Sequence, residues 1–208
     1  MRKNRKPKNR KPKNLSLEIS MNNNLMQIFK DDEFVCIRDK FPKAKFHALI
    51  IPISNEENDE FLNLEQVLES SNCFHFFKKL KEFTLKIVAR LPESIDKNNL
   101  QYGFHAIQTF KPIHMHIISK DFFSPYLKNE KIWNSFNTPY FIHLDDLIRH
   151  LSVDLRECRI NYFKNDIFHL KDCNHLESLL ITSSIKCNIC QQEQVNINSL
   201  KDHLLTHA

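Results

Sequence analysis

The sequence predicts an α+β fold of strands and helices that ends in a small zinc-finger domain. Short runs rich in β-branched and aromatic residues are typical of strands, and apolar residues at helical spacing lie between them. The third observation is a pair of cysteines followed by a pair of histidines near the C-terminus. The 208 residues suit one domain of about 150 residues with an appendage.

Residues 1–14 form a basic tail that we expect to be disordered, because it holds Lys, Arg, Asn and Pro and has nothing to bury. Residues 1–13 carry eight Lys/Arg and no acid, whereas the rest of the chain carries 22 basic and 25 acidic residues. The tail is therefore a solvated charge run, a nuclear-targeting segment or an arm that grips nucleic acid.

In chain order, the first half predicts a short helix, two strands and a longer helical region. Residues 15–29 hold apolar residues that could start the fold as a short helix. Strands are predicted over 34–38 and 46–51 from their β-branched and aromatic content. Helical spacing predicts one long or two short core-packing helices over 61–91, with the polar residues 70–72 as the place for an interruption.

The second half predicts two further strands, over 100–108 and 114–119. A loop rich in aromatic residues, Lys and Asn is expected over 121–139. Apolar positions over 144–155 follow the period of an amphipathic helix. Residues 160–185 have no pattern that predicts an element.

The composition excludes several classes of protein. The single glycine, Gly103, rules out a nucleotide site built on a glycine-rich loop. Six cysteines without an apolar signal segment predict a reducing compartment and no disulfide framework. No apolar run approaches the length of a membrane span, so we expect no membrane partner.

The central feature is a histidine pattern around the strand over 114–119. Side chains alternate along a strand, so His114 and His116 share one face, with His105 on the preceding strand. A neutral imidazole can attack phosphorus, and a second one can protonate the leaving group or hold the tautomer of the first. His47 can neutralise charge on the phosphoryl oxygens. The rival interpretation is a metal site made of His105, His114 and His116.

The C-terminus has the spacing of a Cys₂His₂ zinc site. Cys187 and Cys190 are separated by two residues, and His203 and His207 by three, with twelve residues between the pairs. Two thiolates from a hairpin and two imidazoles one helical turn apart suit tetrahedral Zn²⁺. We expect a structural zinc ion here and no cofactor for the chemistry. A finger beside a phosphate-chemistry domain is also expected to touch nucleic acid.

Several segments resemble the histidine triad (HIT) superfamily and, within it, the aprataxin family. They are 39–52, 103–107, 113–125, 127–138 and the C-terminal finger, and the likeness covers roughly residues 25–207. The resemblance implies an antiparallel sheet of about five strands with packed helices. It also implies a HIT domain over 15–160, with an N-terminal helix, and a zinc-finger domain over 161–208.

The resemblance also implies an activity, the removal of AMP from 5′-adenylated DNA through a covalent histidine–AMP intermediate. His114 maps onto the nucleophile, and His116 onto the third histidine of the triad. His105 maps onto a histidine that assists departure of the leaving group or stabilises charge. His47 maps near the phosphate. Asp39 matches the acid that contacts the ribose, and Lys43 matches a basic residue near the phosphate. The implied AMP site is thus Asp39, Lys43, His47 and His116.

The expected partner is nicked or 5′-adenylated double-stranded DNA, with AMP as the product. Lys43, Lys128 and Lys131 are the candidate phosphate contacts. A helix within 15–29 would act as a wedge against the exposed base pair, through Leu25, Met26, Ile28 and Phe29, unless these residues only cap the core. We expect a monomer in the nucleus, with a further share in the cytoplasm.

One residue departs from the family pattern, because Pro112 stands where the first histidine of the triad is found. That histidine is implied to be supportive and not nucleophilic. Two alternatives remain open: a general HIT hydrolase of small adenylates, and a non-catalytic module that binds DNA. The finger and the basic tail argue against the first, and the four retained histidines argue against the second.

Overall fold

The structure, a computed structural model, describes residues 25–53, 63–153 and 172–207. The predicted tail over 1–14, most of the predicted helix over 15–29 and the predicted domain boundary near residue 160 lie outside the described residues. The division into two domains therefore stays a prediction.

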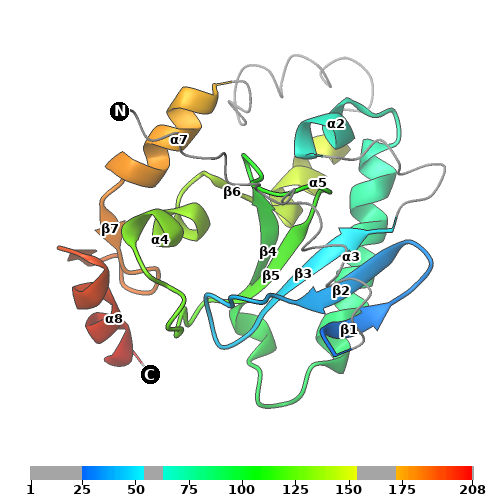
Figure 1. The fold of residues 1–208 in the computed structure, drawn as a ribbon. Helices are drawn as coiled ribbons and strands as arrows, with labels where there is room; N and C mark the ends of the chain where they lie inside the picture. Colours follow the sequence, from blue (N-terminus) through cyan, green and yellow to red (C-terminus); the bar gives the residue numbers. More distant parts are fainter. Residues whose placement is uncertain (1–24, 54–62, 154–171, 208) are drawn as a thin grey trace, which may run out of the picture.

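A six-stranded antiparallel sheet forms the centre of the molecule (Figure 1), in the order β1-β2-β3-β5-β4-β6. This confirms the predicted fold class, with a further edge strand. The strands are β1 Gln27–Lys30, β2 Phe34–Arg38, β3 His47–Pro52, β4 Leu100–His105, β5 Met115–Ser119 and β6 Phe141–His143.

The helix predicted over 15–29 is wrong in its last residues, because Gln27–Lys30 forms strand β1. The Asp31 carboxylate accepts hydrogen bonds from the backbone N–H groups of Glu33 and Phe34 and so folds the connection to β2 into a tight turn. The backbone hydrogen bonds that this segment makes with β2 then outweigh the weak helical spacing of its apolar residues. Leu25 is 90 % exposed, whereas Phe29 packs against Phe83.

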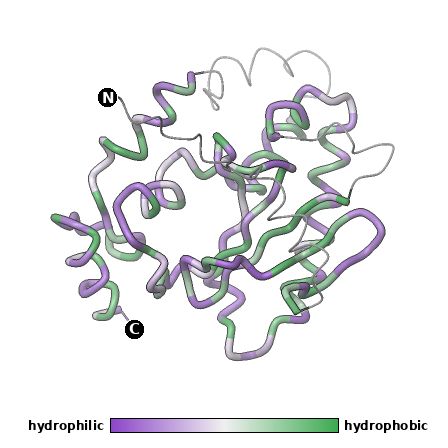
Figure 2. Tube along the Cα trace, in the orientation of Figure 1, coloured by the Kyte–Doolittle hydropathy of each residue, from purple (hydrophilic) through white to green (hydrophobic). Residues whose placement is uncertain are grey.

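Helices α2, α3 and α5 cover one face of the sheet. They are Leu64–Glu69, Cys73–Arg90 and Leu144–Val153, and Lys97–Asn99 forms one 3₁₀ turn, η1, before β4. The interruption predicted at 70–72 is confirmed between α2 and α3. Figure 2 shows β3 as hydrophobic and the β1–β2 turn as hydrophilic.

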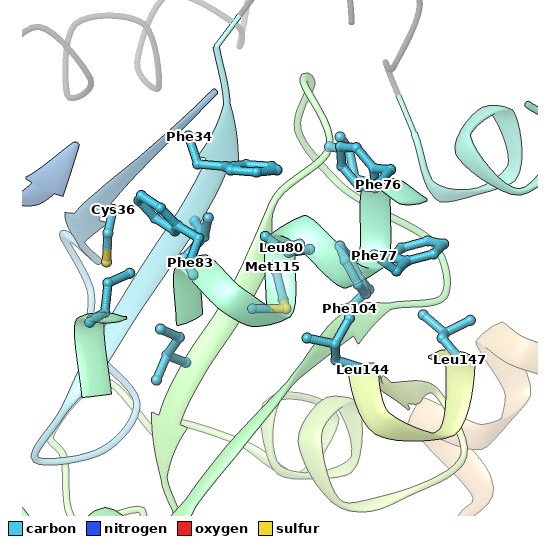
Figure 3. Packing of buried hydrophobic residues seen from close by; sticks show 14 of the residues in the cluster. Phe34, Cys36, Phe76, Phe77, Leu80, Phe83, Phe104, Met115, Leu144 and Leu147 are labelled. Atoms are coloured by element: carbon cyan, nitrogen blue, oxygen red, sulfur yellow. The ribbon is translucent and has the colours of Figure 1, made fainter. Parts of the chain in front are cut away.

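The core on this face is rich in phenylalanine (Figure 3). Phe34 meets Phe76 edge to face, with ring centroids 5.7 Å apart, and Phe77 meets Phe104 at 5.9 Å. Met115 and Ile117 of β5 point into this core, as the alternation predicted. Each such aromatic pair adds about 0.5–1.5 kcal/mol beyond the burial of its area.

The opposite face carries α4, Glu130–Asn137, where the sequence predicted only a loop over 121–139. The Asn129 side chain accepts a hydrogen bond from the backbone N–H of Ile132 and caps the helix. Trp133 and Phe136, three residues apart, are both buried against the sheet face. The loop prediction was wrong because this cap and spacing were not recognised.

The C-terminal finger packs on α4. It contains α7 Cys173–Thr182, β7 Ile185–Lys186, β8 Glu193–Gln194 and α8 Ile197–Leu205. Ile197 and Leu200 share a buried cluster with Trp133 and Phe136. The Glu130 carboxylate accepts a hydrogen bond from the backbone N–H of Ile197. Within the described ranges, no helix has both the length and the apolar character needed to cross a bilayer.

Candidate active site

Four histidines, the histidine cluster, meet on the sheet face that carries α4. His47 begins β3, His105 ends β4, His114 precedes β5 and His116 lies within it. Leu49 of β3 and Gly103 of β4 flank His116 in the ladder. His47, His114 and His116 are at most 5 % exposed.

Gly103 lies beside His116 for a steric reason. A Cβ at this position would be 2.4 Å from the carbonyl oxygen of Ile142 and 2.7 Å from the Phe141 ring. Phe141 contacts the rings of His105 and His116, with centroids 6.0 and 6.3 Å away. The only glycine of the sequence therefore lets strand β6 bring an aromatic ring against the histidine cluster.

A chain of hydrogen bonds fixes which nitrogens of His47 and His116 carry protons. The backbone N–H of Lys43 donates to Nδ1 of His47 over 3.2 Å. Neutral His47 therefore holds its proton on Nε2, which lies 2.9 Å from Nδ1 of His116. Because His116 accepts at Nδ1, its own proton is on Nε2.

His114 is fixed in the tautomer that a nucleophile needs. Its Nδ1 lies 3.1 Å from the backbone carbonyl oxygen of Pro112, which can only accept a hydrogen bond. Nδ1 therefore carries the proton, and Nε2 carries the lone pair. The Gln108 side chain donates to the backbone carbonyl of His114 and so steadies the start of β5.

Two ring nitrogens of the histidine cluster have no hydrogen-bond partner among the residues that the structure describes. They are Nε2 of His105 and Nε2 of His116, and both are buried. Leaving a buried polar atom unpaired costs about 1–3 kcal/mol. Such atoms point to a ligand that supplies the missing partners, and phosphoryl oxygens suit an N–H donor.

All four histidines are kept neutral at physiological pH. Burial lowers the pKa of His47 to about 4 and that of His105 to about 3. Burial also holds the pKa of His116 well below 6.5, and the neighbouring His105 and His47 add to this. For His114, burial lowers the pKa, while its bond to the Pro112 carbonyl and the charge of Asp39 act in the opposite direction.

Phe136 of α4 is the aromatic wall of the histidine cluster, which the sequence analysis missed. Its ring lies against His47, His105 and His116, with centroids 5.6, 4.7 and 5.3 Å away. The ring contributes to the burial of these imidazoles, and burial is the largest cause of their low pKa values. The signal was available, because Phe136 follows the capping Asn129 at helical spacing.

The structure brings Asp39 and Lys43 to this site. An Asp39 carboxylate oxygen lies 3.7 Å from Nδ1 of His47. Burial lowers the pKa of Lys43, with Asp39 raising it and Lys128 lowering it. Lys128 is thus close to Lys43, whereas Lys131 is exposed on α4, outside the histidine cluster.

Among the described residues, the structure does not bring together the metal ligands that the rival interpretation named. The ligand atoms that come within 4.8 Å of one another belong to Asp39, His47 and His116, and not to the predicted set of His105, His114 and His116. In the former set, Nε2 of His47 and Nδ1 of His116 face each other at hydrogen-bond distance.

The second Cys/His group lies in the finger. One donor atom each from Cys187, Cys190, His203 and His207 comes within 4.8 Å of the others. Nε2 of His203 lies 3.1 Å from both Sγ of Cys190 and Nε2 of His207. Gln191, with φ 62°, closes the turn after Cys190. Two thiols and two imidazoles facing one point fit tetrahedral zinc.

Two family models match the chain. "Scavenger mRNA decapping enzyme C-term binding" matches residues 16–132, and "C2HE / C2H2 / C2HC zinc-binding finger" matches residues 137–208. The first range holds the histidine cluster, and the second holds the Cys/His group of the finger.

Curated relatives match across both parts. Aprataxin of Danio rerio is 34 % identical over 191 residues, which is 92 % of this chain and 52 % of the relative. An aprataxin-like protein of Saccharomyces cerevisiae is 31 % identical over 169 residues, covering 70 % of this chain and 77 % of the relative. The chain spans about half the length of the animal aprataxins that it matches.

Solved structures share the fold. The aprataxin ortholog Hnt3 in complex with DNA superposes with a TM-score of 0.66 at 23 % identity, covering 94 % of this chain and 92 % of that chain. The aprataxin ortholog Hnt3 from Schizosaccharomyces pombe gives a TM-score of 0.66 at 21 % identity, covering 96 % and 93 %.

Proposed function

Because the chain belongs to the aprataxin family, we propose that it is a DNA-repair hydrolase that removes AMP from 5′-adenylated DNA. One observation carries the proposal. The Pro112 carbonyl holds the proton of neutral His114 on Nδ1, so that Nε2 has a free lone pair. Beside it are two buried nitrogens that have no hydrogen-bond partner in the described part of the chain.

The first step is an attack of His114 Nε2 on the phosphorus of the AMP group. An N–P bond forms, and the bridging P–O bond to the 5′-phosphate of the DNA breaks. The leaving group is the DNA 5′-phosphate, which departs as an anion and is stabilised by a hydrogen bond from a nearby N–H donor. His105, with its buried Nε2, is our candidate to assist this departure.

In the second step, water attacks the phosphorus and gives up one proton to the solvent, the N–P bond breaks, and AMP and neutral His114 are released. Throughout, Nε2–H of His116 donates to a phosphoryl oxygen, because the bond from His47 fixes its proton there. His47 thus acts through His116. Splitting one displacement into two easier ones is the advantage of the covalent intermediate.

The remaining roles follow from position. Asp39 and Lys43, together with His47 and His116, form the AMP site, with Asp39 on the ribose and Lys43 on the phosphate. Lys43, Lys128 and Lys131 are the DNA contacts. Cys187, Cys190, His203 and His207 hold one structural Zn²⁺, which supplies no chemistry to the reaction.

Pro112 is compatible with this mechanism. What His114 needs from residue 112 is a backbone carbonyl at hydrogen-bond distance, and every residue has a backbone carbonyl. The proline therefore replaces the side chain of the first triad histidine and keeps the contact that sets the tautomer.

The test is turnover of a nicked duplex with a 5′-adenylate, with His114→Ala as the inactive control. We expect the wild type to release AMP and leave a 5′-phosphate, and His114→Ala to release none. Binding of the nick without release would identify a non-catalytic module. Cleavage of small adenylates alone would identify a general nucleotide hydrolase.

We further propose that the protein acts as a monomer in the nucleus. Sedimentation at micromolar concentration tests the first point, and imaging of a tagged chain with and without residues 1–14 tests the second.

A further inference from the structure

Two loops beside the histidine cluster present three exposed aromatic rings among lysines. Phe41 is 51 % exposed, Phe123 55 % and Tyr126 36 %. The Nζ atoms of Lys40, Lys45 and Lys128 lie 5.7, 5.6 and 5.9 Å from the centroids of these rings. We call this set, with Lys43, the lysine–aromatic surface.

The two loops are fastened to each other. One oxygen of Asp121 accepts hydrogen bonds from the backbone N–H groups of Lys45, at 3.0 Å, and Phe123, at 2.8 Å. The Ser124 hydroxyl donates to the carbonyl of Pro42. The rings of Phe41 and Tyr126 meet edge to face, 5.4 Å apart. The rings are thus held in place before any ligand arrives, and the Asp121 charge is engaged by backbone groups.

The backbone is strained at the point that turns one of these rings outward. Phe122 has φ 48°, a left-handed conformation that a non-glycine residue rarely adopts. The side chain of Phe122 packs on Trp133 and is 1 % exposed, whereas Phe123 faces solvent. The same backbone turn therefore buries one phenylalanine in the core and leaves its neighbour exposed on the lysine–aromatic surface.

A cavity of about 310 Å³ adjoins Phe123, between this loop and helix α8. It is lined by Phe122, Phe123, Ser124, Pro125, Lys201, Leu204 and Leu205. Most of the lining is apolar, and Lys201 is its only charged residue. This chemistry suits a flat ring system attached to an anion.

We propose that the lysine–aromatic surface and this cavity bind an unpaired, single-stranded stretch of nucleic acid. Bases stack on exposed rings whatever their sequence, and lysines beside the rings meet the phosphates. In a duplex the base faces are covered by their neighbours, so the rings find no partner there. The proposal rests on the proposed function, because the Lys43 backbone bonds to His47 and so joins the surface to the histidine cluster.

The test is fluorescence anisotropy with a labelled dT15 and a labelled duplex of the same length. Phe123→Leu keeps an apolar side chain and removes the stacking ring. We expect it to weaken binding of dT15 on the order of tenfold and of the duplex less than about twofold. Phe123→Tyr restores dT15 binding. Leu85→Ala, at a residue that is 52 % exposed on α3, is the matched control and binds as the wild type.

Equal losses for dT15 and duplex, or none for Phe123→Leu, would overturn the proposal. A competition experiment with polyglutamate at equal charge gives a second check. If polyglutamate displaces dT15 with the same potency from the wild type and from Phe123→Leu, the proposal is also overturned, because the surface then binds any polyanion. AMP release from an adenylated nick without unpaired nucleotides is measured on the same proteins. A wild type that binds dT15 through Phe123 yet releases no AMP contradicts the proposed function and not the surface.

Discussion

The two faces of the sheet are built by the same six strands, yet they differ in how many polar side-chain atoms they bury. The face under α3 and α5 is a phenylalanine-rich core with little that needs a hydrogen bond. The face under α4 gathers four imidazoles, and within the described residues the Nε2 atoms of His105 and His116 have no hydrogen-bond partner. The first face therefore stabilises the fold. The second face holds polar groups whose burial costs part of that stability.

The sharpest way to break this comparison is to replace His114, the proposed nucleophile. We expect His114→Ala to lower single-turnover AMP release by at least about a thousandfold, as when other enzymes lose a nucleophile. The free energy of unfolding should change by no more than about 1–2 kcal/mol, because one hydrogen bond is lost. Rapid-quench assays and urea titrations measure the two. A large loss of stability would mean that the histidine face also holds the fold together.

The reverse case is Phe77→Ala on the other face. Phe77 is fully buried and contacts Phe76 and Phe104, so its removal should cost about 3–5 kcal/mol of unfolding free energy. Urea titration measures this, and Leu85→Ala on the same helix should stay within about 0.5 kcal/mol. Turnover per folded molecule should hardly change. If it falls with stability, the two faces are not separable.

Acid should destabilise the protein through the histidine face. Above pH 6.5 the histidines are neutral in both the folded and the unfolded protein. Below pH 6.5 His47 binds a proton in the unfolded chain, whereas in the folded protein it stays neutral down to about pH 4. Stability should therefore fall as the pH drops from 6.5 to 4, by on the order of 3 kcal/mol from His47 alone.

Urea titrations at several pH values measure this slope. In His105→Leu the slope should be smaller, since one buried histidine with a pKa of about 3 is gone. A slope identical to that of the wild type would show that His105 does not resist protonation.

The smallest effect is expected from Phe136→Leu. The shorter side chain admits water to the imidazoles, so their pKa values rise toward 6.5. The acid limb of the pH–rate profile for AMP release should move to higher pH by up to about one unit. Ile132→Ala, on the same helix, should leave the limb in place. A loss of activity without a shift would assign Phe136 a packing role only.

The sequence was informative wherever side chains alternate strictly or ligands have a fixed spacing. The strands that carry His47, His105 and His116 and the hairpin–helix of the finger were predicted from such patterns. The alternation also put Met115 and Ile117 in the core, where they lie.

Other features depend on contacts between distant residues. Strand β1 forms because β2 offers ladder hydrogen bonds, which no local pattern records. The proton positions on His47 follow from the backbone of Lys43, four residues away, and so need coordinates. Phe136 was missed for a different reason, an unrecognised helix cap at Asn129.

Helix α4 contacts both the histidine cluster and the C-terminal finger. Phe136 lies against the histidines, while Trp133 shares a cluster with Ile197 and Leu200 of the finger. The finger cannot open locally without loosening the helix that shields the imidazoles. The sheet with its histidine cluster and the C-terminal finger should therefore unfold as one cooperative unit, and hydrogen exchange at α4 should follow exchange at α8.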